Sequence, residues 1–125
     1  RQLDLTALQK EFHSNSLNYT KFWLDIHGVV HSVMSVFEKE SSGEMQEERM
    51  QLAKLGLPKI LGFDFLLDSD GTAWLIEVNR FPGLEPRDSQ DASTKHKVVL
   101  DAWRLAASRK NFTLVHEVKP ESISL

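Results

Sequence analysis

The sequence contains no cysteine, which excludes disulfide bonds and metal sites built on thiolates. It also has no apolar run long enough to cross a bilayer as a helix, so we expect no membrane-spanning segment. Basic residues do not dominate: 15 Lys and Arg stand against 18 Asp and Glu, a formal net charge of −3, which provides no basic field for nucleic acid. The missing cysteines suit a reducing interior, and we expect a cytoplasmic protein.

The composition that is present is that of an ordinary folded domain. Hydrophobic residues make up 41% of the chain and charged residues 26%, values typical of globular proteins. A length of 125 residues corresponds to one domain and is enough to bury an apolar core. The chain begins with Arg1 rather than Met and carries no basic-then-apolar leader, so we expect a piece of a longer protein with a partner region N-terminal to it.

Hydrophobic spacing predicts two amphipathic helices and a shorter charged one. In TKFWLDIHGVVHSVMSVFEKE (20–40), apolar residues recur every three or four positions, and Asn18 is a suitable N-cap. The stretch TKHKVVLDAWRLAASRK (94–110) has the same periodicity. Between them, SSGEMQEERMQLAKLGLP (41–58) is expected to form a loop and then a charged helix that ends at Gly56 and Pro58.

Two apolar stretches predict a β-hairpin. Residues 60–68 and 72–79 are rich in aromatic and branched side chains, and the dipeptide Asp70-Gly71 between them is a hairpin signal. A short alternation, FTLVHEV (112–118), predicts an edge strand in the C-terminal tail. The order helix, hairpin, loop, helix predicts an α+β fold in which an antiparallel hairpin packs against helices.

The hairpin places three polar residues on one face. A two-residue turn at Asp70-Gly71 puts Asp64 opposite Glu77, and opposed residues share a face of an antiparallel pair. Asn79 joins them because strand side chains alternate and it lies two positions beyond Glu77. The opposite face, which is the better core face, then carries Phe63, Phe65, Leu67, Trp74, Ile76 and Val78.

The chemistry of these three side chains predicts a site for a hard cation. Two directly opposed carboxylates repel each other unless something cationic lies between them. Asp64, Glu77 and Asn79 offer carboxylate and amide oxygens without imidazole or thiolate, a set that suits Mg²⁺ shared with substrate phosphates. The alternative is that both acids face solvent on a half-exposed sheet, and spacing does not decide between the two.

Two other candidate metal sites are weaker. LLDSDGTAWLIE (66–77) nearly fits a calcium-loop pattern, but Leu66 occupies the first ligand position and the flanking segments read as strands rather than helices. His27 and His31 lie one helical turn apart without a third ligand nearby, so we interpret them as partly buried helix residues.

The stretch LGFDFLLDSDGTAWLIEVNRFPGL (61–84) resembles the C-terminal catalytic region of the tubulin–tyrosine ligase-like family, part of the ATP-grasp superfamily. The resemblance rests on the pattern G-[FY]-D-[FV], then W-L-[IL]-E-V-N, then Pro, which is matched by Gly62, Asp64, Trp74, Glu77, Asn79 and Pro82. The segment DLTALQKEF (4–12) resembles a shortened Leu-Thr-Asn segment, and TKHKVVLDAW (94–103) resembles the closing helix, with Lys95 and Asp101 in place. Residues 1–125 are therefore expected to form the C-terminal part of such a domain, with a peripheral tail from about residue 111.

The resemblance implies a function. Asp64, Glu77 and Asn79 would hold the Mg²⁺ ions that bridge the phosphates of ATP, and Thr6 would lie by the nucleotide. The reaction would be a ligation: ATP phosphorylates a carboxylate of a protein substrate, tubulin or another, and the amine of a free amino acid attacks the acyl phosphate. Such an enzyme would be cytoplasmic and could associate with microtubules. It would also need the N-terminal lobe of the same domain, so these 125 residues alone are expected to be inactive.

The sequence departs from the family pattern at two places. Ala7 follows Thr6 where the family has Asn, and Arg80 and Phe81 replace the usual small residues before Pro82. Because Arg80 directly follows the proposed metal ligand Asn79, its planar guanidinium could bind a phosphate or a substrate carboxylate. We therefore name Arg80 with Glu77 as candidate catalytic residues. The shortened segment keeps a second interpretation open, a catalytically inactive ATP-grasp-like binding module.

Overall fold

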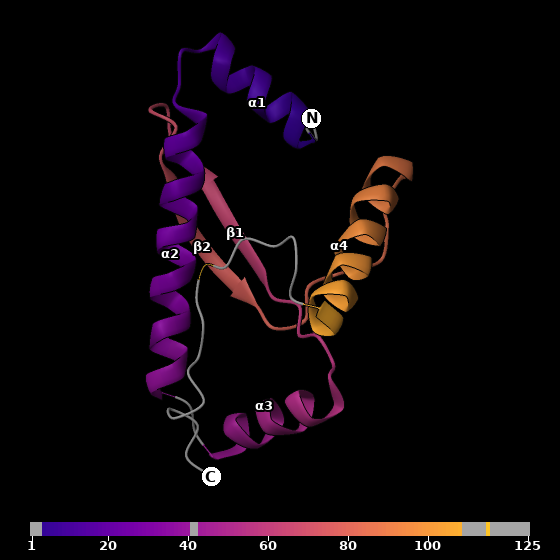
Figure 1. Ribbon diagram of the computed structural model, residues 1–125. Helices are drawn as coiled ribbons and strands as arrows, with labels where there is room; N and C mark the ends of the chain where they lie inside the picture. The colour runs from indigo at the N-terminus through magenta and orange to yellow at the C-terminus, as the bar shows by residue number, and fades with distance from the viewer. Residues whose placement is uncertain (1–3, 41–42, 109–114, 116–125) are drawn as a thin grey trace.

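The computed structural model describes residues 4–40, 43–108 and 115, and it confirms an α+β arrangement of helices around one antiparallel hairpin (Figure 1). The elements in chain order are α1 (Leu5–Ser14), α2 (Tyr19–Glu40), α3 (Gly43–Leu55), β1 (Gly62–Leu67), β2 (Ala73–Asn79) and α4 (Ser89–Ser108). Apart from Val115, the strand expected at 112–118 and the tail from about 111 lie outside the described residues.

The first helix, α1, was not predicted, although its start is visible in the sequence. The side chain of Asp4 caps it by accepting a hydrogen bond of 2.7 Å from the backbone N–H of Ala7. Apolar residues recur at helical spacing after this cap, and Phe12 among them is only 2% exposed. The Asp4 cap and the apolar spacing that follows it are the sequence signals from which this helix could be predicted.

The long helix α2 confirms the prediction made from its apolar stripe and its cap. The side chain of Asn18 accepts a hydrogen bond of 2.9 Å from the backbone N–H of Lys21. The small buried core of the described chain lies where α1, the beginning of α2 and β2 meet, and it consists of Phe12, Phe22 and Ala73. The rings of Phe12 and Phe22 lie 4.9 Å apart between centroids, so aromatic contacts join the two helices.

The hairpin has the predicted pairing at its open end but a different turn. Asp64 lies opposite Glu77 and Gly62 opposite Asn79, as predicted. The turn, however, is longer than two residues, because Asp68 N–H donates to Thr72 O and Gly71 N–H donates to Asp68 O. Gly71 has φ 78°, so a three-residue loop with a left-handed glycine closes the hairpin. A bulge next to the Asp64–Glu77 pair takes up the extra residue.

The longer turn corrects the predicted core face. Trp74 pairs with Leu66 rather than with Leu67, and Ile76 is the extra residue of the bulge. As a result Trp74 and Ile76 are 61% and 63% exposed, whereas Ala73 is buried and Leu75 half-buried in their place. The other predicted core residues divide in a simple way: Phe63, Phe65 and Val78 are half-buried, and Leu67 is exposed.

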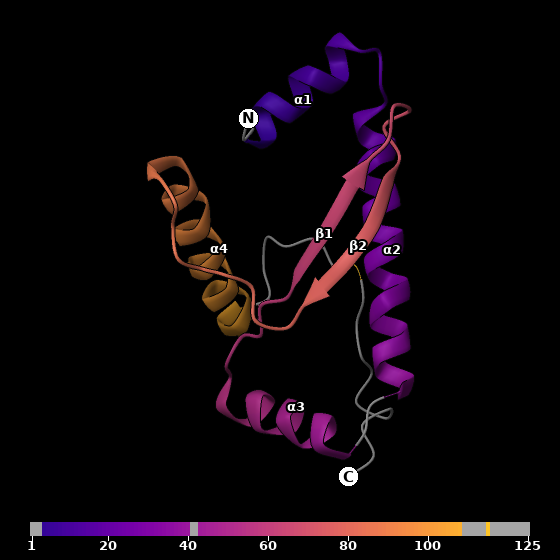
Figure 2. The ribbon, with the colours of Figure 1, turned by 180° about the vertical axis from the view of Figure 1, so that it is seen from behind.

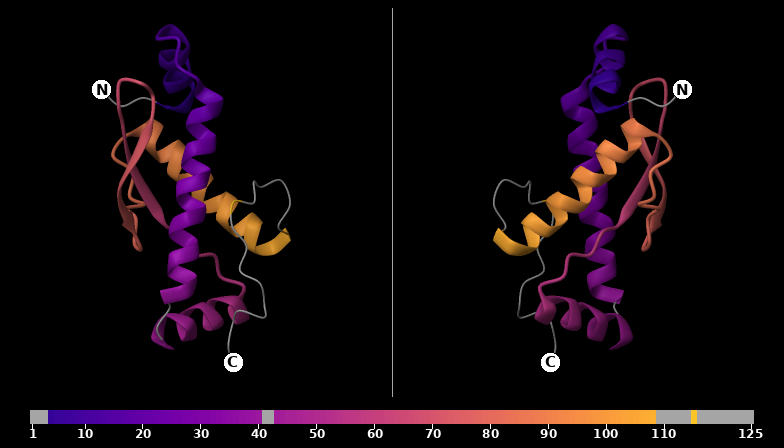
Figure 3. Two further views of the ribbon diagram at one scale, coloured as in Figure 1. Left: turned by 90° about the vertical axis from the view of Figure 1, so that its left-hand side faces the viewer. Right: turned by 90° about the vertical axis from the view of Figure 1, so that its right-hand side faces the viewer.

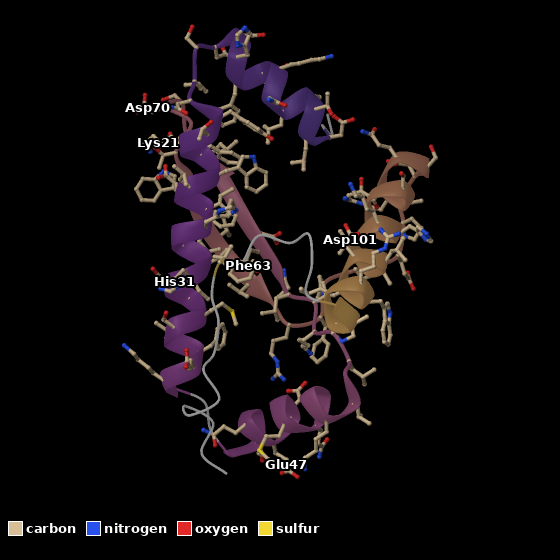
Figure 4. The ribbon with its side chains drawn as sticks, in the orientation of Figure 1. Lys21, His31, Glu47, Phe63, Asp70 and Asp101 are labelled. Carbon is tan, nitrogen blue, oxygen red and sulfur yellow. The ribbon has the colours of Figure 1, made fainter. Side chains whose placement is uncertain are left out.

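One helix, α2, lies along one side of the hairpin. α2 runs alongside β2, and in the view from behind no described helix crosses in front of the two strands (Figure 2). Figure 3 shows the hairpin standing to one side of α2, with α4 crossing α2 obliquely in projection. The polar face that carries Asp64 and Glu77 is exposed, while Phe63 points to the side on which α2 lies (Figure 4).

The two remaining helices begin and end at recognisable signals. α3 ends at Leu55, and the following Gly56 adopts φ 63°, as expected from the Gly56 and Pro58 stop. α4 begins at Ser89 rather than near Thr94, because the side chain of Asp88 accepts a 2.8 Å hydrogen bond from Asp91 N–H. In the described ranges, no helix combines the length and the apolar character needed to span a membrane.

Candidate functional site

The open end of the hairpin brings together three of the predicted site residues. Asp64 and Glu77 are directly opposed and exposed, and Asn79 is half-buried beside them. The Asn79 side-chain Nδ2 donates hydrogen bonds to Asp64 Oδ2 at 3.3 Å and to Glu77 Oε1 at 3.1 Å. One amide group therefore joins both carboxylates.

The orientation of that amide indicates what the three side chains can bind. The partly positive NH₂ group of Asn79 lies between the two carboxylates, in the place where a cation would relieve their repulsion. Rotating the amide by half a turn would present its oxygen instead, completing a set of three oxygen donors. Because both carboxylates face solvent, water and phosphate oxygens can complete the coordination that Mg²⁺ requires. The residues present fit this ion.

No larger metal cluster competes with this interpretation among the described residues. Within 4–40, 43–108 and 115, no group of three His, Cys, Asp or Glu side chains is arranged to hold a metal. At the hairpin, the described side chains that lie together with oxygen atoms are therefore the two carboxylates of Asp64 and Glu77 and the amide of Asn79.

Gly62 explains how Asn79 is held at the end of β2. A Cβ atom added to Gly62 would lie 3.1 Å from Cβ of Pro82 and 3.5 Å from Cβ of Asn79. The absence of a side chain lets the chain after β2 fold back over the start of β1, with Pro82 packed against the backbone. Gly62 and Pro82, both part of the sequence pattern, therefore lie in close contact beside Asn79, which pairs with Gly62 across the hairpin.

Arg80 leaves the hairpin toward α3 instead of packing on the hairpin. Its terminal nitrogen NH2 lies 2.5 Å from Oε2 of Glu48, and Oε1 of the same glutamate lies 3.5 Å from Nζ of Lys59. Lys59 Nζ also lies 4.4 Å from the ring centroid of Phe81. Sequence reasoning missed Glu48 and Lys59, because Glu48 is 32 residues from Arg80 and no local spacing connects them.

Thr6 is not brought to this site. It lies in the first turn of α1 and is exposed, and α1 packs near the hairpin turn (Figure 1). The proposed metal ligands lie at the other end of the hairpin, where β1 begins and β2 ends. The prediction that Thr6 lies by the nucleotide therefore receives no support from the described contacts.

Asp68, a residue of the calcium-loop pattern, has a structural role in the turn. Its Oδ1 accepts hydrogen bonds of 3.0 Å from the backbone N–H groups of Asp70 and Thr72, and its Oδ2 accepts one of 2.8 Å from Trp74 Nε1. These hydrogen bonds, that from Trp74 first, lower the pKa of the Asp68 carboxyl. The carboxylate is thus used within a β-turn, which agrees with rejecting a helix-flanked calcium loop.

The two helix histidines have contacts other than a metal. The ring of His27 lies 6.1 Å from that of Trp23 between centroids, and His27 is half-buried. Nδ1 of His31, which is exposed, lies 3.2 Å from the carbonyl oxygen of Val115. The interpretation of both as partly buried residues is therefore right for His27 and wrong for His31.

Lys95, a matched position of the closing helix, ties the loop after the hairpin to α4. Its Nζ lies 2.8 Å from Asp91 Oδ2 and donates a hydrogen bond of 2.6 Å to the carbonyl oxygen of Glu85. The hydrogen bond from Lys95, followed by that from the Arg87 backbone, lowers the pKa of Asp91 to about 2. The other matched position, Asp101, lies on the side of α4 turned toward the hairpin and pairs with Arg104 at 3.4 Å (Figure 4).

Comparison with known proteins identifies relatives of this chain. Three curated relatives are all called tubulin polyglutamylase TTLL7. The one from Mus musculus is 31% identical over 100 residues and the one from Homo sapiens 30% identical over 100 residues. The one from Xenopus tropicalis is 28% identical over 95 residues. Each match covers 74% of this chain but only 10–11% of the relative, so the chain spans about a tenth of their length.

The comparison with solved structures adds nothing, since none matches this chain significantly. The sequence profile of the tubulin-tyrosine ligase family, in contrast, matches residues 1–112, which include every described element and the whole hairpin. A match over this share of the sequence confirms the resemblance found in the hairpin motif. The chain belongs to the tubulin-tyrosine ligase family.

Proposed function

We propose that this chain is the metal-holding, C-terminal part of an ATP-grasp ligase that joins a free amino acid to a carboxylate of a protein. The observation that carries the proposal is the cluster of Asp64, Glu77 and Asn79 on the open face of the hairpin. Relatives in the family modify tubulin according to their names, which supports an enzyme that modifies proteins. The rest of the domain, including the lobe that would bind adenine, lies outside these residues.

In the proposed mechanism, the side-chain oxygen atoms of Asp64, Glu77 and Asn79 would hold Mg²⁺. When bound there, the ion would supply positive charge to offset the negative charge that develops during phosphoryl transfer from ATP. The acceptor carboxylate attacks the terminal phosphorus, which releases ADP and forms an acyl phosphate. The amine of the incoming amino acid then attacks the acyl carbon, an amide bond forms, a proton leaves the nitrogen, and inorganic phosphate departs.

In this reaction, Arg80 is proposed to bind an anionic oxygen of a substrate. Its guanidinium follows the metal ligands directly along the chain and is about half exposed, so it can approach a phosphate or a substrate carboxylate. Thr6 remains the residue proposed to lie by the nucleotide. A nucleotide bound at the hairpin would come near Thr6 only if the missing lobe bridged the distance from α1 to the hairpin.

Tubulin is the first acceptor to test, and glutamate the first amino acid. Both follow from the names of the matched relatives, tubulin polyglutamylases, rather than from contacts within this chain. If tubulin is the acceptor, the protein would act in the cytoplasm at microtubules.

One observation favours a second candidate function, a binding module that has lost catalysis. Thr6 is followed by Ala7 rather than Asn, and neither residue lies at the hairpin cluster. Mg²⁺-dependent binding of ATP to the complete protein distinguishes the two functions, since a module that has lost its chemistry need not bind nucleotide.

The decisive experiment uses the complete protein that contains this chain. It is incubated with tubulin, ATP, Mg²⁺ and a mixture of amino acids, beside a Glu77→Gln variant, and tubulin is examined by intact and peptide mass spectrometry. A mass increase of one or more amino-acid residues that the variant fails to produce supports the ligase and identifies the amino acid. No increase together with ATP binding indicates a different acceptor, and no increase without ATP binding supports the binding module.

A further inference from the structure

A single carboxylate of α3, that of Glu48, contacts the side chain of Arg80. Glu48 and Arg80 are 32 positions apart, and the 2.5 Å contact between Oε2 of Glu48 and the Arg80 guanidinium links α3 to the end of β2. The second oxygen, Oε1, lies 3.5 Å from Lys59 Nζ in the segment that leads into β1. Glu48 therefore connects three segments at the end of the hairpin where the proposed metal ligands lie.

An aromatic ring completes this arrangement. Lys59 Nζ and Arg80 Cζ lie 4.4 and 5.6 Å from the ring centroid of Phe81, within the range of cation–π contacts. Phe81 itself is 80% exposed, and the side chains of Lys59 and Arg80 are 33% and 47% exposed, so both cations remain accessible to a ligand. We call Glu48, Lys59, Arg80 and Phe81 the Glu48 cluster. Its formal charge is +1, and Arg80 directly follows Asn79 in the chain.

The described contacts leave much of the Arg80 guanidinium available. The guanidinium carries five N–H donors in a fixed plane, and the contact with Glu48 uses the terminal nitrogen NH2. Arg80 is 47% exposed in its side chain. The remaining donors can therefore bind an anionic oxygen while the contact with Glu48 persists.

We propose that Glu48 is a positioning residue, which holds the Arg80 guanidinium so that its remaining donors bind an anionic oxygen of a substrate. That oxygen belongs either to a phosphate of the nucleotide or to a carboxylate of the amino acid or acceptor. The inference rests on the proposed function, because it assumes that substrates bind at the Asp64–Glu77–Asn79 end of the hairpin. It adds a residue from α3, a helix that the sequence motifs do not include.

Positioning matters here because the Arg80 side chain could adopt other rotamers and pair with other carboxylates. A free arginine side chain loses rotamer entropy when it is ordered on binding. Two carboxylates, those of Asp64 and Glu77, are exposed on the same hairpin and would attract a guanidinium that was not held elsewhere. By engaging Arg80 before substrate arrives, Glu48 both fixes the guanidinium and leaves the acidic pair to the metal.

The sign of one kinetic change separates positioning from a simple charge effect. Glu48→Gln removes a negative charge near the proposed anion site. By charge alone, this removal would strengthen anion binding and lower the Michaelis constant of an anionic substrate. Loss of positioning has the opposite effect, because Arg80 then moves away or must be ordered by the substrate itself.

The kinetic test compares Glu48→Gln with Glu47→Gln in the complete protein. Glu47 makes the same change of charge one position along α3, points away from the hairpin, and is paired with Gln51 at 3.5 Å (Figure 4). We expect Glu48→Gln to raise KM for one substrate about fivefold while kcat changes less than about twofold, a loss of binding rather than of chemistry. Glu47→Gln should leave both constants close to wild type. The substrate whose KM rises, ATP, amino acid or acceptor, identifies the source of the anionic oxygen.

A double variant tests whether Glu48 acts through Arg80. If it does, Glu48→Gln added to Arg80→Ala should change KM by less than about twofold beyond Arg80→Ala alone, because the group that Glu48 positions is already absent. Additive effects, an unchanged KM in Glu48→Gln, or a lowered KM would each overturn the proposal.

A measurement that does not depend on turnover keeps the inference separate from the proposed function. The Arg80 side-chain N–H signals, assigned in ¹⁵N-arginine-labelled complete protein with Arg80→Lys, report how firmly the guanidinium is held. We expect restricted rotation in wild type and Glu47→Gln and free rotation in Glu48→Gln. If the wild-type protein ligates nothing, the proposed function fails. The positioning of Arg80 is still supported if its rotation is restricted in wild type and free in Glu48→Gln. Free rotation in the wild type would overturn the inference whether or not the protein is active.

Discussion

Asp64 and Glu77 lie directly opposite each other on β1 and β2, and the side-chain amide of Asn79 donates a hydrogen bond to each of the two carboxylates. Two facing carboxylates weaken a hairpin unless positive charge lies between them. The arrangement is therefore costly as plain sheet structure and useful as a cation site. This relationship makes the metal interpretation testable through stability, without any assay of activity.

Changing Asn79 to Asp should make the hairpin depend on a divalent cation. The substitution replaces the NH₂ group that bridges Asp64 and Glu77 with a third carboxylate. Without Mg²⁺, we expect the free energy of unfolding to fall by about 1 kcal/mol, the scale of like-charge repulsion across strands. With Mg²⁺, we expect the variant to gain more stability than wild type, because carboxylate binds the ion better than amide oxygen does.

Hydrogen exchange of the β1 and β2 amides, followed by mass spectrometry with and without Mg²⁺, checks this expectation in the complete protein. Sodium at equal ionic strength is the control for general screening. A variant whose protection responds equally to both salts would show that the three side chains do not form a specific site.

Gly62→Ala should disturb Asn79 through Pro82. The added Cβ would lie 3.1 Å from Cβ of Pro82, so Pro82 would have to shift by a few tenths of an ångström, and with it the chain that follows Asn79. We expect a loss of about 1–3 kcal/mol in stability, as for other overpacked sites, together with a higher Mg²⁺ concentration for half-maximal activity. Gly83→Ala is a matched control, because a Cβ there meets nothing within 4 Å. Equal Mg²⁺ requirements for both variants would contradict the role given to Gly62.

The sequence was sufficient for the pairing of Asp64 with Glu77 but not for the faces of the strands. The predicted two-residue turn and the observed three-residue loop differ by one residue, and the bulge at Ile76 cancels that difference at the open end of the hairpin. Between the turn and the bulge, the β2 residues pair one position away from the predicted partners. Trp74 therefore lies on the opposite face from the predicted one and is exposed. A bulge has no reliable local signal in a single sequence, whereas a helix cap has one, as Asn18 illustrates.

The Glu48 cluster could not be predicted for a different reason. Glu48 lies in a charged helix where several neighbouring acids look equivalent, and only the position of α3 in the folded chain selects it as the partner of Arg80. Contacts between residues far apart in sequence require a tertiary structure or an alignment to reveal them.

Two glycines should respond in opposite ways to alanine. Gly28 lies inside α2, and a Cβ there meets nothing within 4 Å, so Gly28→Ala should stabilise α2 by about 0.5–1 kcal/mol. Gly71 has φ 78°, and a Cβ there would lie 3.1 Å from the Phe12 ring, so Gly71→Ala should destabilise the hairpin by more than about 1 kcal/mol. Amide exchange in α2 and in the two strands measures the two effects separately. Destabilisation by Gly28→Ala would indicate that α2 is covered at this point by another part of the protein.

Acid should loosen the junction between the hairpin loop and α4 through Asp91. Its pKa is lowered to about 2 from 3.8, first by the hydrogen bond from Lys95. A carboxyl with a depressed folded-state pKa contributes stability that is complete above its unfolded pKa and is lost as pH falls through the folded value. We therefore expect protection of the amides at the start of α4 to decrease between about pH 4 and pH 2 in wild type. Asp91→Asn should be less protected at neutral pH and should lose the part of the acid dependence that this carboxylate supplies. An unchanged pH profile in the variant, measured with pH-corrected exchange rates, would show that Asp91, which accepts a hydrogen bond from the Arg87 backbone N–H and pairs with Lys95, does not hold the loop on α4.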